Sequence, residues 1–283
     1  MSTVQVFVLG LIAGATILLG LPVGRLRRPA PALRQLLNAA AAGVLVFLLW
    51  DVLSAAFEPL DAAVVDLHGG KGGAGPVFGY GLLFLGGLTV GLMGLVYYES
   101  WMRRRAAAPE PKFGPGAMAS GELAAERTAL RLTPARRLAL LIAIGIGLHN
   151  FAEGLAIGGA AAAGDIAMAT LLVIGFSLHN ATEGFGITAP LAGEAERPSW
   201  GLLLGLGVIG GGPTFLGTVI GHSVTNQAVS VAFLTLAAGS ILYVVLQLAG
   251  IGLKGRRDLL GWGLVAGMAA GFLTDLIISA AGV

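Results

Sequence analysis

Residues 148–154 read LHNFAEG and residues 178–184 read LHNATEG, and each stretch lies in the middle of a long apolar run. The two stretches repeat one pattern thirty residues apart. In an α-helix, residues four apart share a face, so the His and the Glu of each stretch lie about one turn apart on the same side. The Asn lies at the edge of that face. Each helix is therefore predicted to present a stripe of His, Asn and Glu.

A turn near Asp165-Ile166 would bring the two predicted helices together as an antiparallel pair. His149 then comes level with Glu183, and His179 comes level with Glu153. The result is two layers of one imidazole and one carboxylate, about 6 Å apart at the helical rise per residue. This donor set suits Zn²⁺, Fe²⁺ or Mn²⁺ better than Ca²⁺ or Cu(I).

The composition is that of an integral membrane protein. Of 283 residues, 56% are hydrophobic and only 11% are charged, whereas a soluble domain carries more charge. Apolar windows long enough to cross a bilayer predict an all-α fold with eight transmembrane helices, near residues 4–24, 35–57, 76–98, 136–162, 166–190, 200–221, 228–250 and 259–281. No basic residue precedes the first window, so we interpret it as a retained helix and not as a signal peptide.

The basic residues predict the orientation, because Lys and Arg accumulate on the cytoplasmic side of membrane proteins. With both termini outside, sixteen of the seventeen basic residues lie inside and only Lys71 lies outside. The net charge of +2 thus reflects topology and gives no reason to expect a nucleic-acid partner. The chain has no cysteine, so a metal site must use nitrogen and oxygen ligands.

The first three and the last three predicted helices match weakly in sequence. Because five crossings separate their starts, the second triplet runs in the opposite sense, and inverted repeats around a polar centre are typical of transporters. The matches align Gly14, Leu19, Gly20 and Gly24 with Gly211, Leu216, Gly217 and Gly221; Ala42-Gly43 and Asp51 with Ala238-Gly239 and Gln247; and Gly79-Tyr80-Gly81-Leu82 with Gly261-Trp262-Gly263-Leu264.

Several other features carry expectations. Asp51 lies deep in an apolar window, where it either has a functional partner or is solvated near an interface. Residues 58–75 are expected to form an acidic outer loop, and residues 102–135 a cytoplasmic loop. Thr133-Pro134 is typical of a helix start. The run 210–213, GGGP, is expected to loosen or kink its helix. His222 is interpreted as an interfacial residue, and Asp275 has no assigned role.

The paired His-Asn-x-x-Glu-Gly motif in the fourth and fifth of eight helices resembles that of the ZIP (Zrt/Irt-like) metal transporters, and the resemblance extends over essentially the whole chain. It implies uptake of a divalent metal toward the cytoplasm across the cell membrane, with zinc the commonest substrate and iron, manganese or cadmium as other substrates. It implies one transmembrane domain, 1–283, with a 3+2+3 helix arrangement and an elevator-like movement of helices one, four, five and six. It implies no enzyme activity and no prosthetic group, and it leaves a homodimer open. The implied metal ligands are His149, Asn150, Glu153, His179, Asn180 and Glu183.

The chain departs from the family pattern at three places. Ala152 and Thr182 stand where relatives often carry Pro before Glu, and the loop between helices three and four has no His. Gly212 stands where many relatives carry an acidic ligand in helix six. Two dications would then face only two carboxylates, so we predict one tight ion, held by His149, Glu153, His179 and Glu183, with the asparagine side at most a weak transit site.

Three alternatives stay open from the residues alone. The His and Glu side chains could only hydrogen-bond each other and lock the helix hairpin. An intramembrane metalloenzyme could use the same ligands to activate water, although the His-Glu-x-x-His and Gly-x-Ser-x-Gly patterns are absent. A membrane protein that holds metal without moving it also fits the ligands, but it leaves the inverted repeats unexplained.

Overall fold

The structure is a computed structural model that describes residues 3–26, 31–106, 133–164, 166–192, 194–223 and 226–280. Within these ranges some helical side chains are not described, among them that of His179. The described part is all α-helix and short 3₁₀-helix without strands, as predicted. In chain order the elements are α1 Thr3–Ala15, η1 Thr16–Leu19, η2 Leu21–Arg25, α2 Pro31–His68, α3 Ala74–Ala106, α5 Pro134–Ala162, α6 Ile166–Thr188, η3 Ala189–Leu191, α7 Trp200–Gly221, α8 Gln227–Gly252 and α9 Arg257–Ala280.

Six helical segments among the described residues are long and apolar enough to cross a membrane. They are Thr3–Arg25, α2, Ala74–Trp101 of α3, α5, α7 and α8. The remaining two predicted spans are the helices α6 and α9, and both include side chains outside the described set. The membrane class of the fold is thus supported by length and apolarity in six of the eight predicted windows.

One expectation about a helix break was wrong. The expected outer loop begins only after His68, because α2 continues through Pro59 to that residue. A proline removes only one N–H donor, and the Ala, Val and Leu residues that follow it favour continued helix. Helix α7 is continuous through GGGP at 210–213, with Pro213 inside the helix, and the expected loosening or kink at this run stays a prediction. The loop between α3 and α5 is also shorter than expected, since helix covers residues 102–106 and begins again at 134; residues 107–132 lie outside the described part.

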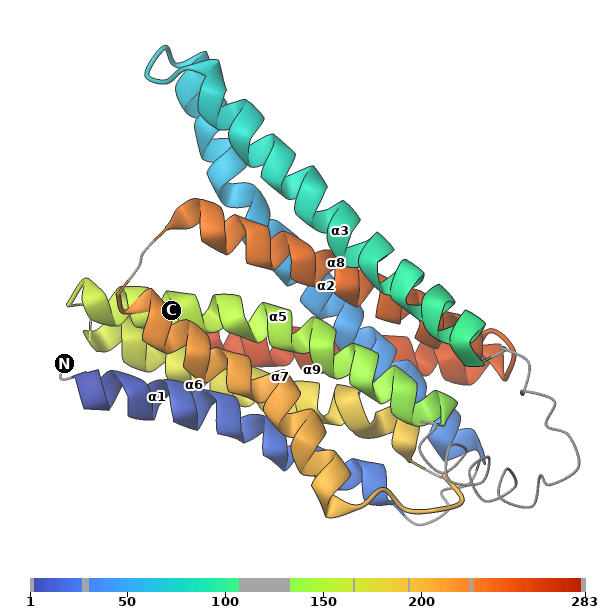
Figure 1. The fold of residues 1–283 in the computed structure, drawn as a ribbon. Coiled ribbons are helices and arrows are strands. Elements are labelled where there is room, and N and C mark those ends of the chain that lie inside the picture. The colour runs from blue at the N-terminus through green and yellow to red at the C-terminus, as the bar shows by residue number, and fades with distance from the viewer. Residues whose placement is uncertain are drawn as a thin grey trace, which may run out of the picture.

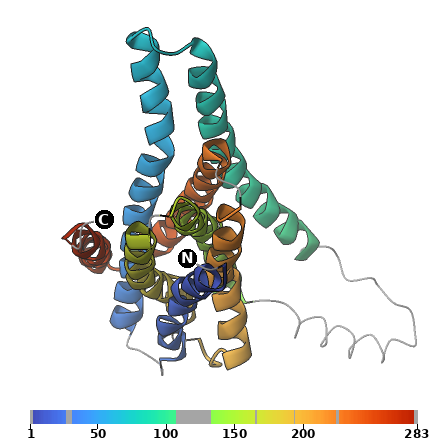
Figure 2. The same cartoon turned by 90° about the vertical axis from the view of Figure 1, so that its left-hand side faces the viewer.

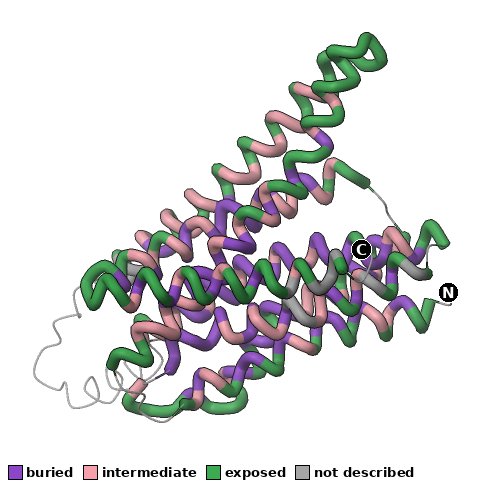
Figure 3. The backbone as a smooth tube through the Cα atoms, turned by 180° about the vertical axis from the view of Figure 1, so that it is seen from behind, coloured by how far each residue is buried: buried purple, intermediate pink, exposed green. Residues whose placement is uncertain are grey.

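The helices pack in two groups (Figures 1 and 2). We call α1, α5, α6 and α7 the site group, because α5 and α6 carry the repeated motif, and α2, α3, α8 and α9 the flanking group. Within the flanking group α2 packs on α9 and α3 packs on α8. The groups meet where α5 lies on α8 and where α6 lies on α2 and α9. Buried positions gather in the bundle, whereas the projecting end of the α2–α3 hairpin is exposed (Figure 3).

Glycines let the helices of the site group approach to backbone contact. A Cβ atom on Gly14 would clash with the carbonyl of Gly211, and one on Gly211 would clash with the carbonyl of Gly14. The N-terminal helix and α7 therefore cross at residues that the repeat alignment had paired.

The repeat alignment also relates the contacts that the N-terminal helix and α7 make with the motif helices α6 and α5. A Cβ on Gly20 would meet the carbonyl of Ala181 and the N–H of Phe185. A Cβ on Gly217, the aligned residue, would meet Phe151 and Leu155, which lie thirty residues before Ala181 and Phe185. The contact of the first helix with α6 is thus repeated residue by residue in the contact of α7 with α5.

The flanking group repeats its contacts too, but in a register that the sequence alignment missed. Gly91 of α3 lies against Leu236 of α8, and Gly267 of α9 lies against Ala40 of α2. Since Ala40 and Leu236 have the separation of the predicted pair Gly43 and Gly239, Gly91 corresponds to Gly267. The predicted pairing of Gly79 with Gly261 is therefore wrong. Helix α3 is so rich in glycine that sequence alone allowed several registers, and close packing selects one of them.

Candidate metal centre

The motif helices form an antiparallel pair. Thr133 caps α5 as predicted, because its hydroxyl accepts a hydrogen bond from the Arg136 N–H at 3.2 Å. The α5–α6 turn contains Gly164 at φ +80°, a left-handed conformation that favours glycine. Asp165, at the expected centre of the turn, lies outside the described residues.

The hairpin brings His149, Glu153 and Glu183 together. The Nε2 atom of His149 lies 3.2 Å from Oε1 of Glu153 and 3.9 Å from Oε1 of Glu183. Their exposed fractions are 3%, 6% and 1%, so all three are enclosed by the helices. The prediction that His149 lies level with Glu183 is confirmed. The matching layer of His179 and Glu153 stays a prediction, because the His179 side chain is not described.

Both asparagines act as donors to backbone carbonyls. Asn150 Nδ2 donates to Glu183 Oε2 at 2.9 Å and to the carbonyl of Gly210 in α7 at 3.0 Å. Asn180 Nδ2 donates to the carbonyl of Ala13 in α1 at 2.9 Å. Ala13 and Gly210 have the same separation as Gly14 and Gly211, so the two bonds are equivalent in the repeat. The motif alone did not predict these carbonyl partners, although the repeat alignment pairs the positions that provide them.

Several buried oxygens of the centre have no hydrogen-bond partner among the described residues. They are Asn150 Oδ1, Asn180 Oδ1 and Glu153 Oε2. Thr214 Oγ1 of α7 is likewise buried without a hydrogen-bond partner in the described part of the chain. A buried polar atom without a partner normally costs about 1–3 kcal/mol. Unpartnered oxygens beside an imidazole are, however, the donor set that a divalent cation satisfies. This arrangement disfavours the alternative in which the motif side chains only bond one another.

The described side chains do not by themselves complete a metal site. No group of three or more His, Cys, Asp or Glu residues in that part of the chain is arranged to hold an ion. The predicted ligand His179 is not among the side chains that could enter such a group.

A further acidic residue, Asp51, lies within electrostatic range of the centre. Asp51 of α2 interacts electrostatically with His149, Glu153 and Glu183, and also with Asp275 of α9. The sequence could not place Asp51, because its position depends on how the two helix groups meet. Its interpretation as a partner of buried charges is favoured over a purely solvated position.

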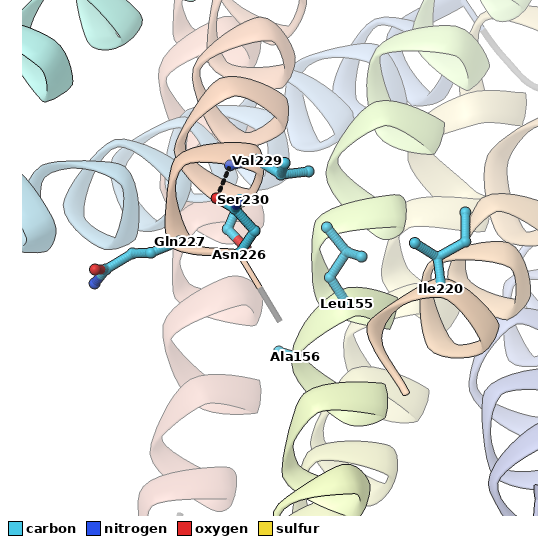
Figure 4. A pocket seen from close by; sticks show the side chains of 7 residues that line it. All are labelled: Leu155, Ala156, Ile220, Asn226, Gln227, Val229 and Ser230. Carbon is cyan, nitrogen blue, oxygen red and sulfur yellow. Dashed lines mark hydrogen bonds between the residues drawn. The ribbon is translucent and has the colours of Figure 1, made fainter. Parts of the chain in front are cut away.

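A groove opens near the end of the bundle where α5 and α7 finish and α8 begins (Figure 4). Its volume is about 320 Å³. Its lining combines apolar side chains of the site group with polar and apolar ones from the start of α8 and its N-cap: Leu155, Ala156, Ile220, Asn226, Gln227, Val229 and Ser230. Leu155 lies only two residues beyond Glu153 on α5, about 3 Å along the helix. The groove lies toward one end of the bundle and on the boundary between the groups.

A family profile described as the ZIP zinc transporter matches residues 114–247. This span includes both motif stretches, all of α5, α6 and α7, and most of α8. Residues 114–247 are thus similar to the ZIP zinc transporter domain. Proteins of this family are membrane transporters of divalent metals. No curated protein matches the chain.

Proposed function

We propose that this ZIP protein carries zinc across the cell membrane toward the cytoplasm. The observation that carries the proposal is the enclosed cluster of His149, Glu153 and Glu183, with unpartnered buried oxygens around it. Two carboxylates at this depth are costly without a cation, and a dication offsets both charges. Iron, manganese and cadmium are the other substrates that this donor set accepts.

The tight ion is held by His149, Glu153, His179 and Glu183. Asn150 and Asn180 form a weaker side, since each supplies only a neutral carbonyl oxygen and each amide nitrogen is already engaged by a backbone carbonyl. The Oδ1 atoms stay available to an ion in transit. No further carboxylate comes from α7, where Gly212 stands next to Pro213.

The proposed architecture has eight spanning helices in a 3+2+3 arrangement with inverted three-helix repeats and both termini outside. It is supported by contacts that recur at constant separations in the sequence, such as Gly20 with α6 and Gly217 with α5. The basic residues support the orientation. Transport moves the site group against the flanking group, and the largely apolar boundary between α5 and α8 suits such movement.

The deciding experiment is zinc flux into proteoliposomes that contain the purified protein. Flux that saturates with zinc supports a transporter. A protein that binds zinc but passes none supports the binding-protein alternative, and metal-dependent hydrolysis without flux supports the metalloenzyme alternative.

Titration of the purified protein tests the ion count. We expect saturation near one zinc per chain, lost when His149→Ala and His179→Ala are combined. A second tight ion that survives the double substitution and disappears in Asn150→Ala would contradict the one-ion reading.

A further inference from the structure

A buried polar cluster lies where the C-terminal part of α3 meets α8. Glu99 of α3 is only 8% exposed, and its Oε2 atom accepts hydrogen bonds from the Tyr243 hydroxyl and, at 2.7 Å, from Gln247 Nε2. Its other oxygen, Oε1, lies 3.3 Å from Nη2 of Arg137, near the start of α5. Donors from two other helices therefore converge on one carboxylate, and the ion pair with Arg137 joins the flanking group to the site group.

The neighbouring arginine is engaged differently. Arg136 pairs with Glu194 at 3.2 Å, and Glu194 also accepts a hydrogen bond from Thr133. These residues lie at the start of α5 and in the segment between α6 and α7, so the Arg136 pair stays within the site group. Arg136 and Arg137 are adjacent in one helical turn, but of these two only Arg137 pairs with a residue of the flanking group.

Two other contacts of the α5–α8 boundary join apolar or small groups. The rings of Phe151 and Phe233 lie 4.3 Å apart, and Gly145 faces Ser240, whose Cβ would lie 3.3 Å from a Cβ on the glycine. Such surfaces can slide with little change in energy, because dispersion contacts are non-directional. A largely buried carboxylate–guanidinium pair is directional and short-ranged, so it favours one position of α5 on α3 and α8.

In the sequence, the residues equivalent to this pair in the repeat do not form a second acid–arginine pair. By the contact register of the flanking helices, Asp275 corresponds to Glu99 and Asp51 corresponds to Gln247. The residue that corresponds to Arg137, thirty positions on, is Ala167. The equivalent place therefore has two acids and no arginine, and the groove of Figure 4 opens near the end opposite the Arg137 pair.

We infer that Glu99 and Arg137 are positioning residues for transport: their pair holds the inner end of α5 against the flanking group while the outer groove is open. The inference rests on the proposed movement of the site group. His149 lies twelve residues from Arg137, about 18 Å along α5, so the pair acts on the metal centre through the helix and does not touch the ion. Each transport cycle has to break and reform it.

The absence of native cysteines allows a two-ended test with purified protein in detergent. Ala156→Cys places a reporter in the outer groove, and Ser240→Cys, nearly isosteric, places one at the buried α5–α8 boundary. The rate of maleimide labelling is measured for each reporter with Arg137→Gln, with Glu99→Gln, and with the control Arg136→Gln.

We expect Arg137→Gln and Glu99→Gln to raise the labelling rate at position 240 about tenfold and to lower it at position 156. Loss of the pair reduces the stability of the paired state, and a tenfold change in the equilibrium constant between the two states changes their population ratio by the same factor. Arg136→Gln should stay within about twofold at both reporters, and Arg137→Lys should restore much of the original behaviour. Opposite changes at the two reporters distinguish a shifted equilibrium from local loosening.

Equal rates in Arg137→Gln and Arg136→Gln, or faster labelling at both ends, would overturn the inference. Zinc titration of the same variants separates this outcome from failure of the proposed function. Unchanged binding in every variant leaves the metal site intact and makes the labelling decisive, whereas absence of binding in the unsubstituted protein would reject the proposed function itself.

Discussion

Replacing Glu183 by Gln tests the metal centre most directly. Glu183 is 1% exposed, it accepts a hydrogen bond from Asn150, and it faces His149 from the opposite helix. Glutamine has nearly the same shape and keeps an acceptor for Asn150, so the substitution removes the charge and little else. An effect on metal binding is then an effect of charge.

The expected loss follows from burial. Breaking a buried charge pair by removing one partner costs about 3–5 kcal/mol, because the remaining charge is left uncompensated. At about 1.4 kcal/mol per factor of ten, zinc affinity should fall between roughly a hundredfold and several thousandfold. Zinc flux should be lost while the protein stays folded in the membrane. Glu153→Gln should behave in the same way, and Asn150→Ala should cost less.

The assay is calorimetric titration with zinc, followed by flux in proteoliposomes. Glu194→Gln is the matched control, because Glu194 is also a carboxylate in an ion pair, with Arg136, but lies in the segment between η3 and α7, against the start of α5. A Glu183→Gln protein whose zinc affinity stays within about threefold of the original, well under the smallest loss expected, would refute the charge argument.

The remaining predictions concern the membrane topology, the effect of pH, the packing of α7 and the role of Asp51. A cysteine introduced at Lys112 should react with an impermeant reagent only from the inside, and labelling in intact cells would overturn the orientation. Acidification from about pH 7.5 to about pH 5.5 should lower the apparent zinc affinity, because protons compete for imidazole and carboxylate ligands; an unchanged affinity in uptake assays would count against these ligands. Gly217→Ala should lower thermal stability by about 1–3 kcal/mol, because its methyl group would clash with the carbonyl of Phe151; Gly205→Ala, which meets open space in the same helix, should not. Asp51→Asn should weaken zinc binding by less than Glu183→Gln does, and equal effects in titration would show that Asp51 is a direct ligand.

The membrane class, the helix positions and the core of the site could be predicted because they depend on local pattern. Apolar windows of fixed length predict spans, and a four-residue spacing predicts a shared helical face. The thirty-residue repeat placed His149 level with Glu183 because helical rise fixes register along an antiparallel pair. These inferences use only geometry within one or two helices.

What could not be predicted depends on contacts between distant helices. The carbonyls of Ala13 and Gly210 belong to helices that carry no motif, and their role exists only once those helices pack on α5 and α6. The register of α3 against α9 was misassigned because many glycines fit equally well in sequence. The continuation of α2 through Pro59 was missed because a proline signals a break only when nothing else sustains the helix.

The position of Asp51 bears on the energy of a bound ion before and after the proposed movement. Asp51 belongs to the flanking group, whereas His149, Glu153 and Glu183 belong to the site group. Attraction between a bound dication and Asp51 falls with their separation, and it is strong only where the effective dielectric constant is low. Movement of the site group therefore weakens this attraction and leaves the attraction of Glu153 and Glu183 unchanged. Under the proposed function we therefore expect the ion to be held most strongly in the arrangement where Glu99 and Arg137 pair and the groove is open. Leaving that state requires both to weaken together, which links release of the ion to opening of the opposite end.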